Sequence, residues 1–492
     1  MTLRLQNRIG AGKEAAPATF EVRSPSDGEL IAIAPRSGAA EIARAVEAAS
    51  AAFPRWRDTP APARGELLLR AGRVLEARKD EIARLMAREM GKRLEEARGD
   101  VQEAIDTAAY AATEGRRLFG RTAPSELPNK FGMTVRRPVG VAGVITAWNF
   151  PVAVPSWKIL PALVCGNTVV WKPAEESPAS GDAFAGALEE AGLPAGVLNV
   201  VHGADEAGSA LVAQAGVDLV SFTGSTEVGR QIAQTAGRTL KRVSLEMGGK
   251  NPVIVLPDAD LDLAVDGLLW GAFGTAGQRC TATSRLIAVG DVAKELLPRL
   301  IERARALRLG DPLDPATEVG PLVSERQLRR VHGFVETAAR EGGALLCGGA
   351  RAEEGRLARG FFYLPTIVDS VRPGSTLALQ EVFGPVLAVL RARSLDEAIA
   401  IANEVEYGLS SSIYTRDVSA AFRAIERIDA GITYVNAPTI GAEAHFPFGG
   451  VKQTGNGHRE GGWAPYEFFT EVKTVYVDYS GALQRAQIDN RG

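Results

Sequence analysis

The spacing of hydrophobic residues near the start of the chain is helical. In one short segment the apolar positions recur three or four residues apart, at Ile42, Val46, Ala49 and Phe53. A longer amphipathic stretch from about Gly65 to Phe119 is interrupted near Gly91, which indicates two packed helices with a break between them. Because Ala, Arg, Glu and Leu also dominate the first 120 residues, we expect this region to be mostly helical.

From about Val141 the pattern changes to short β-branched runs that alternate with Ala-rich amphipathic segments, which is typical of βαβ units in a parallel sheet. The first series of strand-like runs is VAGVITA, NTVVWKP, GVLNVVHG, LVSFTG and RVSLEMGG. A second series begins after NPVIVLP and contains SRLIAVG, FFYLPTIVDS, SSSIYT and GITYVNA. The pattern therefore predicts an α/β protein with two doubly wound parallel sheets.

Two more strand-like segments, MTVRRPVGVAG and TEVKTVYVDYS, alternate apolar and polar residues but have no obvious partner strand beside them in sequence. Such segments could form an arm that pairs with another subunit. A small β-subdomain within a monomer is the alternative, and the pattern leaves both interpretations open.

Length, charge and cysteine count limit the class of protein. A chain of 492 residues suggests about three domain-sized units, and 56 basic against 59 acidic residues give a formal charge of -3, which requires neither nucleic acid nor an acidic membrane as a partner. The chain has no run of about 18 apolar residues for a transmembrane helix and no signal-peptide pattern. Three scattered cysteines fit a reducing compartment, so we expect a cytoplasmic protein.

Cys280 is the first candidate for chemistry. It lies in FGTAGQRCTATSR, where Gly274 and Gly277 provide a flexible approach and small polar residues flank the thiol. Because a free cysteine has a pKa of about 8.5, a nucleophilic thiol needs a base, a dipole or a cation beside it. Taken alone, a single cysteine is more often a small buried hydrophobe.

Two further side chains could assist this cysteine. Glu246 ends the strand-like run in SLEMGGK, where its carboxylate would point into a cleft and deprotonate either the thiol or a hydrolytic water. Asn149, in AWNFP, follows the first apolar strand, and its amide could stabilise an oxyanion together with the backbone N–H of the nucleophile. A solvated glutamate and an ordinary turn asparagine are the alternatives.

The segment SFTGSTEVGRQI has the strand, turn and helix of a dinucleotide-binding unit. Gly224 and Gly229 are present, but the middle glycine of G-x-G-x-x-G is missing, so a pyrophosphate would not bind in the usual way. Free N–H groups and the hydroxyls of Ser225 and Thr226 at a helix N-terminus still favour a phosphate. An ordinary N-cap is the alternative.

VVWKPAEESP adds two candidate cofactor contacts, Lys172 and Glu175, just past a strand end, where a doubly wound sheet binds its ligand. A carboxylate there accepts a hydrogen bond from a ribose 2′-hydroxyl and repels a 2′-phosphate. Glu175 therefore favours NAD over NADP.

Seven motifs taken in order resemble the aldehyde dehydrogenase superfamily: AWNFP, WKILPALVCGNTVVWKPAE, FTGSTEVG, LEMGGK, FGTAGQRCTA, EVFGPV and FPFGGVKQTGNGHRE. The resemblance runs from about residue 20 to 480. It implies a nucleophile at Cys280, a general base at Glu246, an oxyanion donor at Asn149 and a lysine associated with catalysis at Lys158. The cofactor contacts that it implies are Trp148, Lys172, Glu175, Gly224, Ser225, Gly229, Glu381 and Phe383, with Glu381 on the nicotinamide ribose and Phe383 beside the nicotinamide.

The resemblance also implies a domain plan. We expect two Rossmann-like sheets, with a cofactor-binding domain from residues 1–120 and 140–248 and a catalytic domain from residues 249–450. Residues 121–139 and 465–492 would form a small β oligomerisation arm. The implied assembly is a homo-oligomer, either a dimer or a dimer of dimers.

The implied reaction is the oxidation of an aldehyde to a carboxylic acid with NAD, or alternatively NADP, as hydride acceptor. Cys280 adds to the aldehyde, and water activated by Glu246 hydrolyses the resulting thioester. No metal is needed, and the four histidines show no ligand spacing. The alternatives are a CoA-acylating enzyme, which could dispense with Glu246, and a cysteine hydrolase, which would need a histidine partner.

The last fifty residues resemble family members that act on semialdehydes, and we expect 2-oxoglutarate semialdehyde as the substrate. Arg279 adjoins the nucleophile and could bind the remote carboxylate of such a substrate. We favour a bracing role in the loop for Arg279, because side chains adjacent in sequence tend to point apart. In GNGHRE this chain departs from the G-x-G-R-E of many relatives, and we expect the added His458 to be structural.

Overall fold

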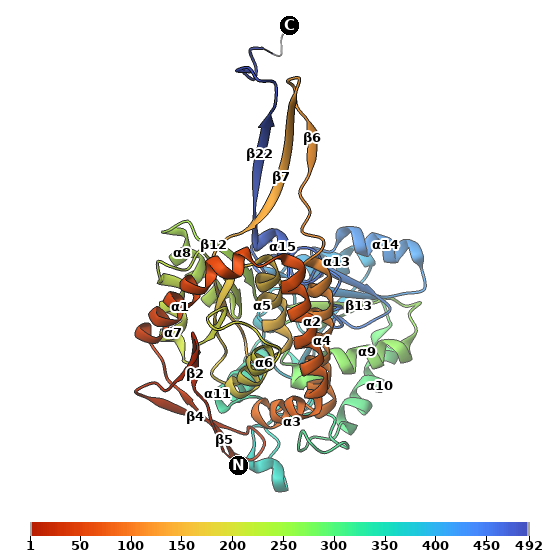
Figure 1. Cartoon of the computed structure of the whole chain (residues 1–492). Coiled ribbons are helices and arrows are strands. Elements are labelled where there is room, and N and C mark those ends of the chain that lie inside the picture. The colour runs from red at the N-terminus through yellow and green to blue at the C-terminus, as the bar shows by residue number, and fades with distance from the viewer. Residues whose placement is uncertain (1, 490–492) are drawn as a thin grey trace.

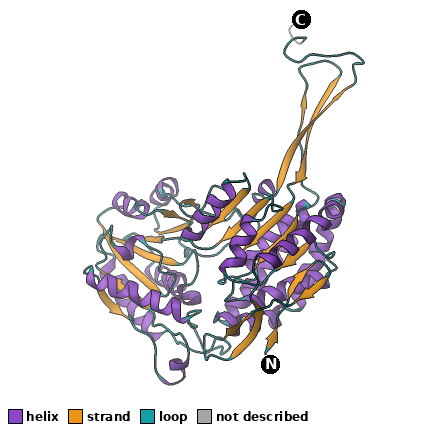
Figure 2. Ribbon diagram, turned by 90° about the vertical axis from the view of Figure 1, so that its left-hand side faces the viewer, coloured by secondary structure: helices purple, strands orange, loops and turns teal. Residues whose placement is uncertain are grey.

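Two seven-stranded sheets form the centre of the structure, a computed structural model that describes residues 2–489 (Figures 1 and 2). The first sheet has the strand order β12-β11-β8-β9-β10-β2-β3, in which the first five strands are parallel and the last two are antiparallel additions at one edge. Its strands, in that order, are Arg242–Glu246, Leu219–Thr223, Val141–Ile145, Thr168–Lys172, Leu198–Val200, Asn7–Ile9 and Gly12–Glu14.

The second sheet has the order β15-β16-β17-β14-β13-β19-β20, and all its strand pairs are parallel except β15 with β16. Its strands are Ala344–Cys347, Thr366–Asp369, Val386–Ala392, Thr283–Val289, Asn251–Val255, Ser410–Tyr414 and Ile432–Val435. The prediction of an α/β protein with two largely parallel sheets is confirmed. The interior strand β17 was not among the predicted runs, because its first five residues, VLAVL, are all apolar, and such a run does not distinguish a strand from a buried helix.

Helices cover both faces of the sheets. On the first sheet, α2 to α6 pack against one face and α1, α7 and α8 against the other. Their bounds are α1 Ala39–Asp58, α2 Ala61–Ala77, α3 Lys79–Met90, α4 Leu94–Glu114, α5 Ala153–Cys165, α6 Pro178–Glu190, α7 Asp205–Ala213 and α8 Thr226–Gly237. The helices around the second sheet are α9 Leu261–Phe273, α10 Ala293–Ala306, α11 Glu325–Arg340, α12 Thr376–Leu379, α13 Leu395–Asn403 and α14 Val418–Arg427.

The N-terminal region differs from its prediction in two respects. Residues 3–35 form strands rather than helix: β2 and β3 add to the first sheet, and β1 (Leu3–Arg4), β4 (Thr19–Arg23) and β5 (Leu30–Pro35) form a small sheet of their own. Tight turns with Gly10 and Gly28 at positive φ connect these strands. The strands were not predicted because the later helices dominate the composition of the first 120 residues. The break at Gly91 is confirmed, but a further break at Arg78 makes three helices instead of two.

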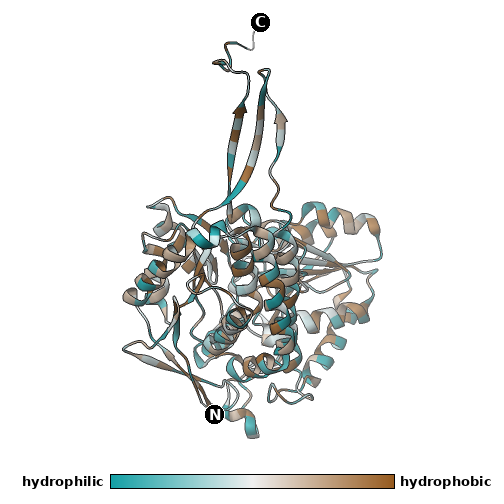
Figure 3. Ribbon diagram, viewed as in Figure 1, coloured by the Kyte–Doolittle hydropathy of each residue, from teal (hydrophilic) through white to brown (hydrophobic). Residues whose placement is uncertain are grey.

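The two strand-like segments without obvious partners pair with each other. In a three-stranded arm, β7 (Lys130–Pro138) lies between β22 (Thr470–Asp478) and β6 (Thr122–Pro124), and all pairs are antiparallel. The arm projects away from the two lobes, and hydrophobic and hydrophilic residues both occur along its strands (Figures 1 and 3). Residues 490–492 of the predicted arm lie outside the described residues.

Two short strands, β18 (Tyr407–Gly408) and β21 (Val451–Lys452), pair with each other, and the short helix α15 (Pro465–Phe468) directly precedes the arm strand β22. Within residues 2–489, no helix is both long enough and apolar enough to cross a lipid bilayer.

Candidate functional site

A cavity of about 530 Å³ lies where the carboxyl ends of β8, β11 and β12 meet the loop that precedes β14. It is lined by Cys280, Glu246 and Asn149. The first and last of these in sequence, Asn149 and Cys280, are 131 positions apart. The carboxyl edge of a parallel sheet is where such folds place their ligands. The structure thus brings the three candidates for chemistry into one cavity.

Cys280 is partly exposed and follows an unusual turn. Thr275, Ala276 and Gly277 have φ angles of 50°, 52° and 68°, so three consecutive residues adopt the left-handed conformation just before it. Burial, followed by the negative charges of Glu381 and Glu246, raises the pKa of the Cys280 thiol to about 12. At neutral pH the thiol is therefore protonated and needs a base before it can attack.

Asn149 is buried and directed toward the cysteine loop. Its Nδ2 donates a hydrogen bond of 3.1 Å to the backbone carbonyl of Gln278, two residues before Cys280. The amide carries a second N–H, and it is a neutral donor in a buried site. Such a donor can stabilise negative charge on an oxygen bound near the thiol.

Glu246 is the last residue of β12, and its side chain is buried. Among residues 2–489 no side chain forms a hydrogen bond with its carboxylate oxygens, and the one backbone donor that affects its pKa is the Gly450 N–H. Burial raises the pKa of Glu246 well above its ordinary value, the nearby Glu460 raises it further, and Lys158 lowers it. A Cβ at Gly449 would lie 2.3 Å from Glu246 Oε1, so glycine at that position makes room for this carboxyl group.

Lys158 and Glu460 form a buried ion pair next to Glu246. Lys158 lies on α5, and its Nζ also donates a hydrogen bond of 3.2 Å to Ser221 Oγ. Glu460 was not identified as a site residue from the sequence, although it ends the GNGHRE run that also contains His458. His458 itself is exposed and its ring centre lies 4.8 Å from that of Phe468, a surface contact away from the cavity.

Three predicted cofactor residues line the same cavity. Glu381 is placed by a hydrogen bond of 3.0 Å from the backbone N–H of Gly249, and burial raises its pKa to about 7. A Cβ at Gly248 would lie 2.2 Å from Glu381 Oε2, so only glycine leaves space for this carboxyl group. Phe383 and Trp148 pack edge to face with ring centres 5.4 Å apart.

The turn before α8 offers an anion site at the cavity wall. Gly224 and Ser225 line the cavity, and Ser225 Oγ accepts a hydrogen bond from the Val228 N–H, so it is the N-cap of the helix. Within the described part of the chain, the buried Thr223 hydroxyl lines the cavity and makes no hydrogen bond, whereas Thr226 has Tyr407 as a partner. A free hydroxyl beside the positive end of a helix fits a phosphate group.

The other predicted cofactor residues lie outside the cavity wall. Gly229, in the first turn of α8, packs against Met247, where a Cβ would lie 2.3 Å from Sδ. Lys172 is buried at the end of β9, and burial lowers its pKa while Glu176 and Glu175 raise it. Lys172 and Glu175 lie at the same sheet edge as the cavity but do not line it.

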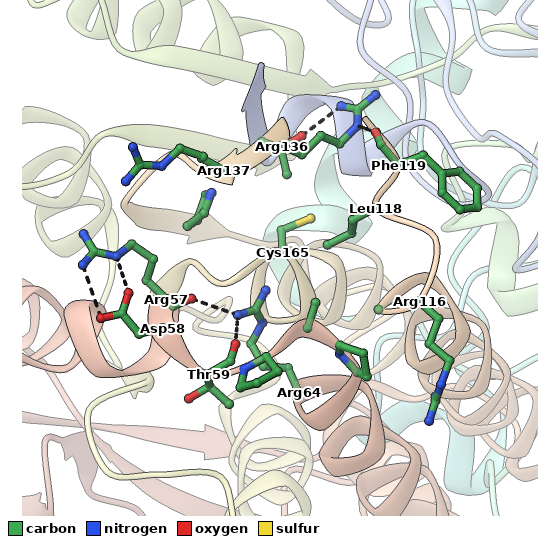
Figure 4. Close-up of a pocket in the computed structure, with 16 residues that line it drawn as sticks. Arg57, Asp58, Thr59, Arg64, Arg116, Leu118, Phe119, Arg136, Arg137 and Cys165 are labelled. Atoms are coloured by element: carbon green, nitrogen blue, oxygen red, sulfur yellow. Dashed lines mark hydrogen bonds and ion pairs between the residues drawn. The ribbon is translucent and has the colours of Figure 1, made fainter. Parts of the chain in front are cut away.

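A second cavity, of about 730 Å³, lies at the base of the arm and is lined by several arginines (Figure 4). The guanidinium groups of Arg57, Arg116 and Arg136 point in different directions, and each already has a partner. Those partners are Asp58 at 2.9 Å, Glu66 at 2.8 Å and Thr470 Oγ1 at 3.0 Å. The arginines therefore do not converge on one ligand position, unlike the groups around Cys280.

Comparison with known proteins gives a consistent result over nearly the whole chain. The model of a family described as "Aldehyde dehydrogenase family" matches residues 13–475. An alpha-ketoglutaric semialdehyde dehydrogenase of Bacillus subtilis is 42% identical, with 93% of this chain and 94% of that protein covered. An alpha-ketoglutarate semialdehyde dehydrogenase of Haloferax volcanii is 44% identical, with 94% and 96% covered. The crystal structure of an NAD-dependent aldehyde dehydrogenase from Sinorhizobium meliloti has a TM-score of 0.95 at 36% identity, with 98% and 96% covered.

Proposed function

This chain belongs to the aldehyde dehydrogenase family, and we propose that it oxidises a semialdehyde to a carboxylic acid with NAD, through a thioester on Cys280. It is thus an oxidoreductase that acts on aldehydes with a nicotinamide cofactor. The observation that carries the mechanism is the meeting of Cys280, Asn149 and Glu246 in one cavity that Glu381 and Phe383 also line.

The first step is addition of the Cys280 sulfur to the aldehyde carbon. Because burial keeps the thiol protonated, its proton must leave as the C–S bond forms, and we assign that proton to water at the partly exposed thiol, which leaves Glu246 unprotonated for the second half of the reaction. The aldehyde oxygen then carries negative charge, which the Asn149 amide and the Cys280 backbone N–H can stabilise. Each such donor contributes roughly 3 kcal/mol to the transition state.

The residues around Glu381 fit a nicotinamide dinucleotide. Glu381 would hold the nicotinamide ribose, Phe383 and Trp148 would flank the ring, and the turn before α8 would hold the phosphates. The chemistry that NAD supplies when bound is the acceptance of a hydride. We assign residues 1–120 and 140–248 to cofactor binding and residues 249–450 to catalysis on this basis.

The second half of the reaction is hydrolysis of the Cys280 thioester. A water molecule attacks the acyl carbon, Glu246 takes its proton, and the C–S bond breaks to release the acid and the cysteine. No side chain in the described structure forms a hydrogen bond with the Glu246 carboxylate, which supports a role in binding this water. Lys158 and Glu460 adjust the proton affinity of Glu246 through their charges.

The names of curated relatives support a semialdehyde as the substrate. The curated relatives at 42% and 44% identity are named for alpha-ketoglutarate semialdehyde, which agrees with the resemblance of the C-terminal sequence. An apolar wall of Val154, Trp157 and Phe448 packs near Cys280 and can hold the carbon chain of a small substrate. We propose 2-oxoglutarate semialdehyde.

The test is a comparison of kcat/KM for 2-oxoglutarate semialdehyde, malonate semialdehyde and the uncharged aldehyde pentanal, each with NAD and with NADP. We expect the highest value for 2-oxoglutarate semialdehyde with NAD, because Glu175 disfavours a 2′-phosphate. A higher value for pentanal would refute the semialdehyde assignment. Absence of reduced cofactor with every aldehyde would refute aldehyde oxidation.

Replacement of Lys158 should shift the pH dependence of thioester hydrolysis. Lys158 lowers the pKa of Glu246, so Lys158→Met should raise that pKa further, and the base should lose its proton only at higher pH. We expect the acid limb of the hydrolysis rate to move up by about one pH unit. Rapid-quench measurement of acyl-enzyme decay from pH 5 to 9 gives the limb.

The double variant Lys158→Met/Glu460→Gln is the control, because it removes the cation together with the carboxyl group that raises the Glu246 pKa. Its acid limb should return to the wild-type position or lie slightly below it, because Glu460 raises the Glu246 pKa by more than Lys158 lowers it. A limb that stays in place or moves to lower pH in Lys158→Met would contradict the assignment of Glu246 as the base.

The arm is suited to pairing with a second copy of the chain. Apolar side chains on β7 and β22 are exposed, with exposed fractions of 43% for Phe131, 61% for Val472 and 67% for Tyr476. Exposed apolar strands of this kind are normally covered. We expect light scattering at micromolar concentration to give a multiple of the chain mass of 52.1 kDa, and a mass of one chain would contradict the proposal.

A further inference from the structure

Helix α4 carries two buried carboxylates that the proposed chemistry does not use. Glu96 and Asp100 are four residues apart, so they lie on the same face of the helix, and their exposed fractions are 8% and 2%. Each has a cation as partner: Arg279 Nη2 lies 2.7 Å from Glu96 Oε1, and Lys92 Nζ lies 2.7 Å from Asp100 Oδ2. Because buried charges are costly to desolvate, we asked what else these two carboxylates hold.

Glu96 holds the left-handed turn that leads to the nucleophile. Its Oε1 accepts hydrogen bonds from the Thr275 backbone N–H at 2.8 Å, from Thr275 Oγ1 at 3.2 Å and from Arg279. Thr275 and Ala276 are both left-handed, a strained conformation that non-glycine residues rarely adopt. The turn therefore persists only because neighbouring groups hold it, and Glu96 supplies three of the contacts.

Asp100 holds the segment that carries the oxyanion donor. Its Oδ1 accepts hydrogen bonds from the backbone N–H groups of Ala153 at 2.7 Å and Val152 at 3.3 Å, at the beginning of α5. Val152 and Ala153 follow Asn149 by three and four positions. The partner Lys92 also lies over the Phe150 ring, 3.6 Å from its centre, and so contacts the residue next to Asn149.

The two held segments meet at the site. The Asn149 amide donates to the carbonyl of Gln278, so the oxyanion donor and the cysteine loop are joined directly. Helix α4 therefore holds both sides of this junction: Glu96 holds the cysteine loop, and Asp100, one turn later, holds the segment that follows Asn149. Arg279 is occupied by Glu96 and lies 4.6 Å from the Trp270 ring centre, which makes it part of this support rather than a free cation for a substrate.

We propose that Glu96 and Asp100 are positioning residues that fix the Cys280 thiol relative to the Asn149 amide. The inference rests on the proposed roles of Cys280 and Asn149. A displacement of about 1 Å between reacting groups slows a reaction by up to about 100-fold. Loss of either carboxylate should thus slow addition to the aldehyde while leaving the cofactor contacts at Glu381 and Phe383 in place.

The test is the pre-steady-state burst of NADH in Glu96→Gln and Asp100→Asn. The burst amplitude counts active sites, and the burst rate constant reports the chemistry at each site, so a fold defect and a positioning defect are separable. We expect a rate constant 10- to 100-fold below wild type in each variant, with the KM for NAD within twofold of wild type. The double variant should lose less than the product of the two single effects, because both act on one geometry.

Glu95→Gln is the matched control, since Glu95 is the exposed neighbour on the same helix, and it should retain the wild-type rate constant. If Glu96→Gln does not fold, Thr275→Ala removes one of the three contacts from the other side and should slow the burst severalfold. A wild-type rate constant per active site in these variants would overturn the positioning role. Cys280→Ser keeps the two proposals apart, because a burst that survives in that variant would overturn the proposed function instead.

Discussion

Cys280→Ser is expected to abolish aldehyde-dependent formation of NADH. A serine hydroxyl is a far weaker nucleophile than a thiol, and the site offers it no strong activation, because Glu246 and Glu381 place negative charge near the attacking atom. We expect kcat/KM to fall by at least about 10³-fold. The measurement is NADH absorbance with 2-oxoglutarate semialdehyde and saturating NAD.

Cys347→Ser is the matched control for this prediction. Cys347 is buried at the end of β15 in the second sheet and does not line the cavity, so its replacement should leave kcat/KM near the wild-type value. The dissociation constant for NAD, measured by calorimetry, should be the same in both variants. Substantial turnover by Cys280→Ser would mean that the aldehyde is not attacked by this residue.

Glu246→Gln should separate the two halves of the reaction. The amide is close in shape to the carboxyl group but cannot take a proton from water, so the thioester should form and then persist. We expect one equivalent of NADH per active site in a burst, followed by a steady-state rate about 10²- to 10⁴-fold below wild type. Stopped-flow absorbance gives the burst, and mass spectrometry of quenched enzyme gives the acyl group on Cys280.

Two outcomes of the Glu246→Gln experiment, together with a CoA assay on the wild-type enzyme, distinguish the possible roles of Glu246. A burst with a stalled acyl-enzyme supports Glu246 as the base for water. Loss of the burst as well would mean that Glu246 is required to activate the thiol. Full turnover on addition of CoA to wild-type enzyme, but not without it, would favour the CoA-acylating reaction instead.

The two sheets could be predicted from the sequence because they depend on local patterns. β-branched runs between amphipathic segments mark parallel strands, and Glu246 follows such a run, so its place at the carboxyl edge could be inferred. The meeting of Cys280, Glu246 and Asn149 in one cavity was implied by the family resemblance. Their roles stay predictions until the variants are measured.

The features that could not be predicted depend on contacts between distant segments. The contact between Glu96 and Thr275 joins residues 179 positions apart, and the partner of Lys158 is 302 positions away at Glu460. Neither pairing leaves a periodic signal along the chain. The arm strands β7 and β22 were recognised as strands, but alternation alone could not show that they pair with each other.

The order in which the chain is synthesised has a consequence for the first sheet. Its edge strand β12 is completed by the C-terminal segment, since Asn456 bonds to both Leu245 N–H and the Val243 carbonyl, and Arg242 bonds to the Thr470 carbonyl. Because β12 ends at Glu246 and Asn456 follows it by more than 200 residues, the ribosome must add all of these residues before that edge is covered. Until then the emerging chain exposes an open strand edge and lacks Glu460. Late-forming contacts of this kind slow folding and expose intermediates to aggregation, so this enzyme should depend on chaperones more than its size alone suggests.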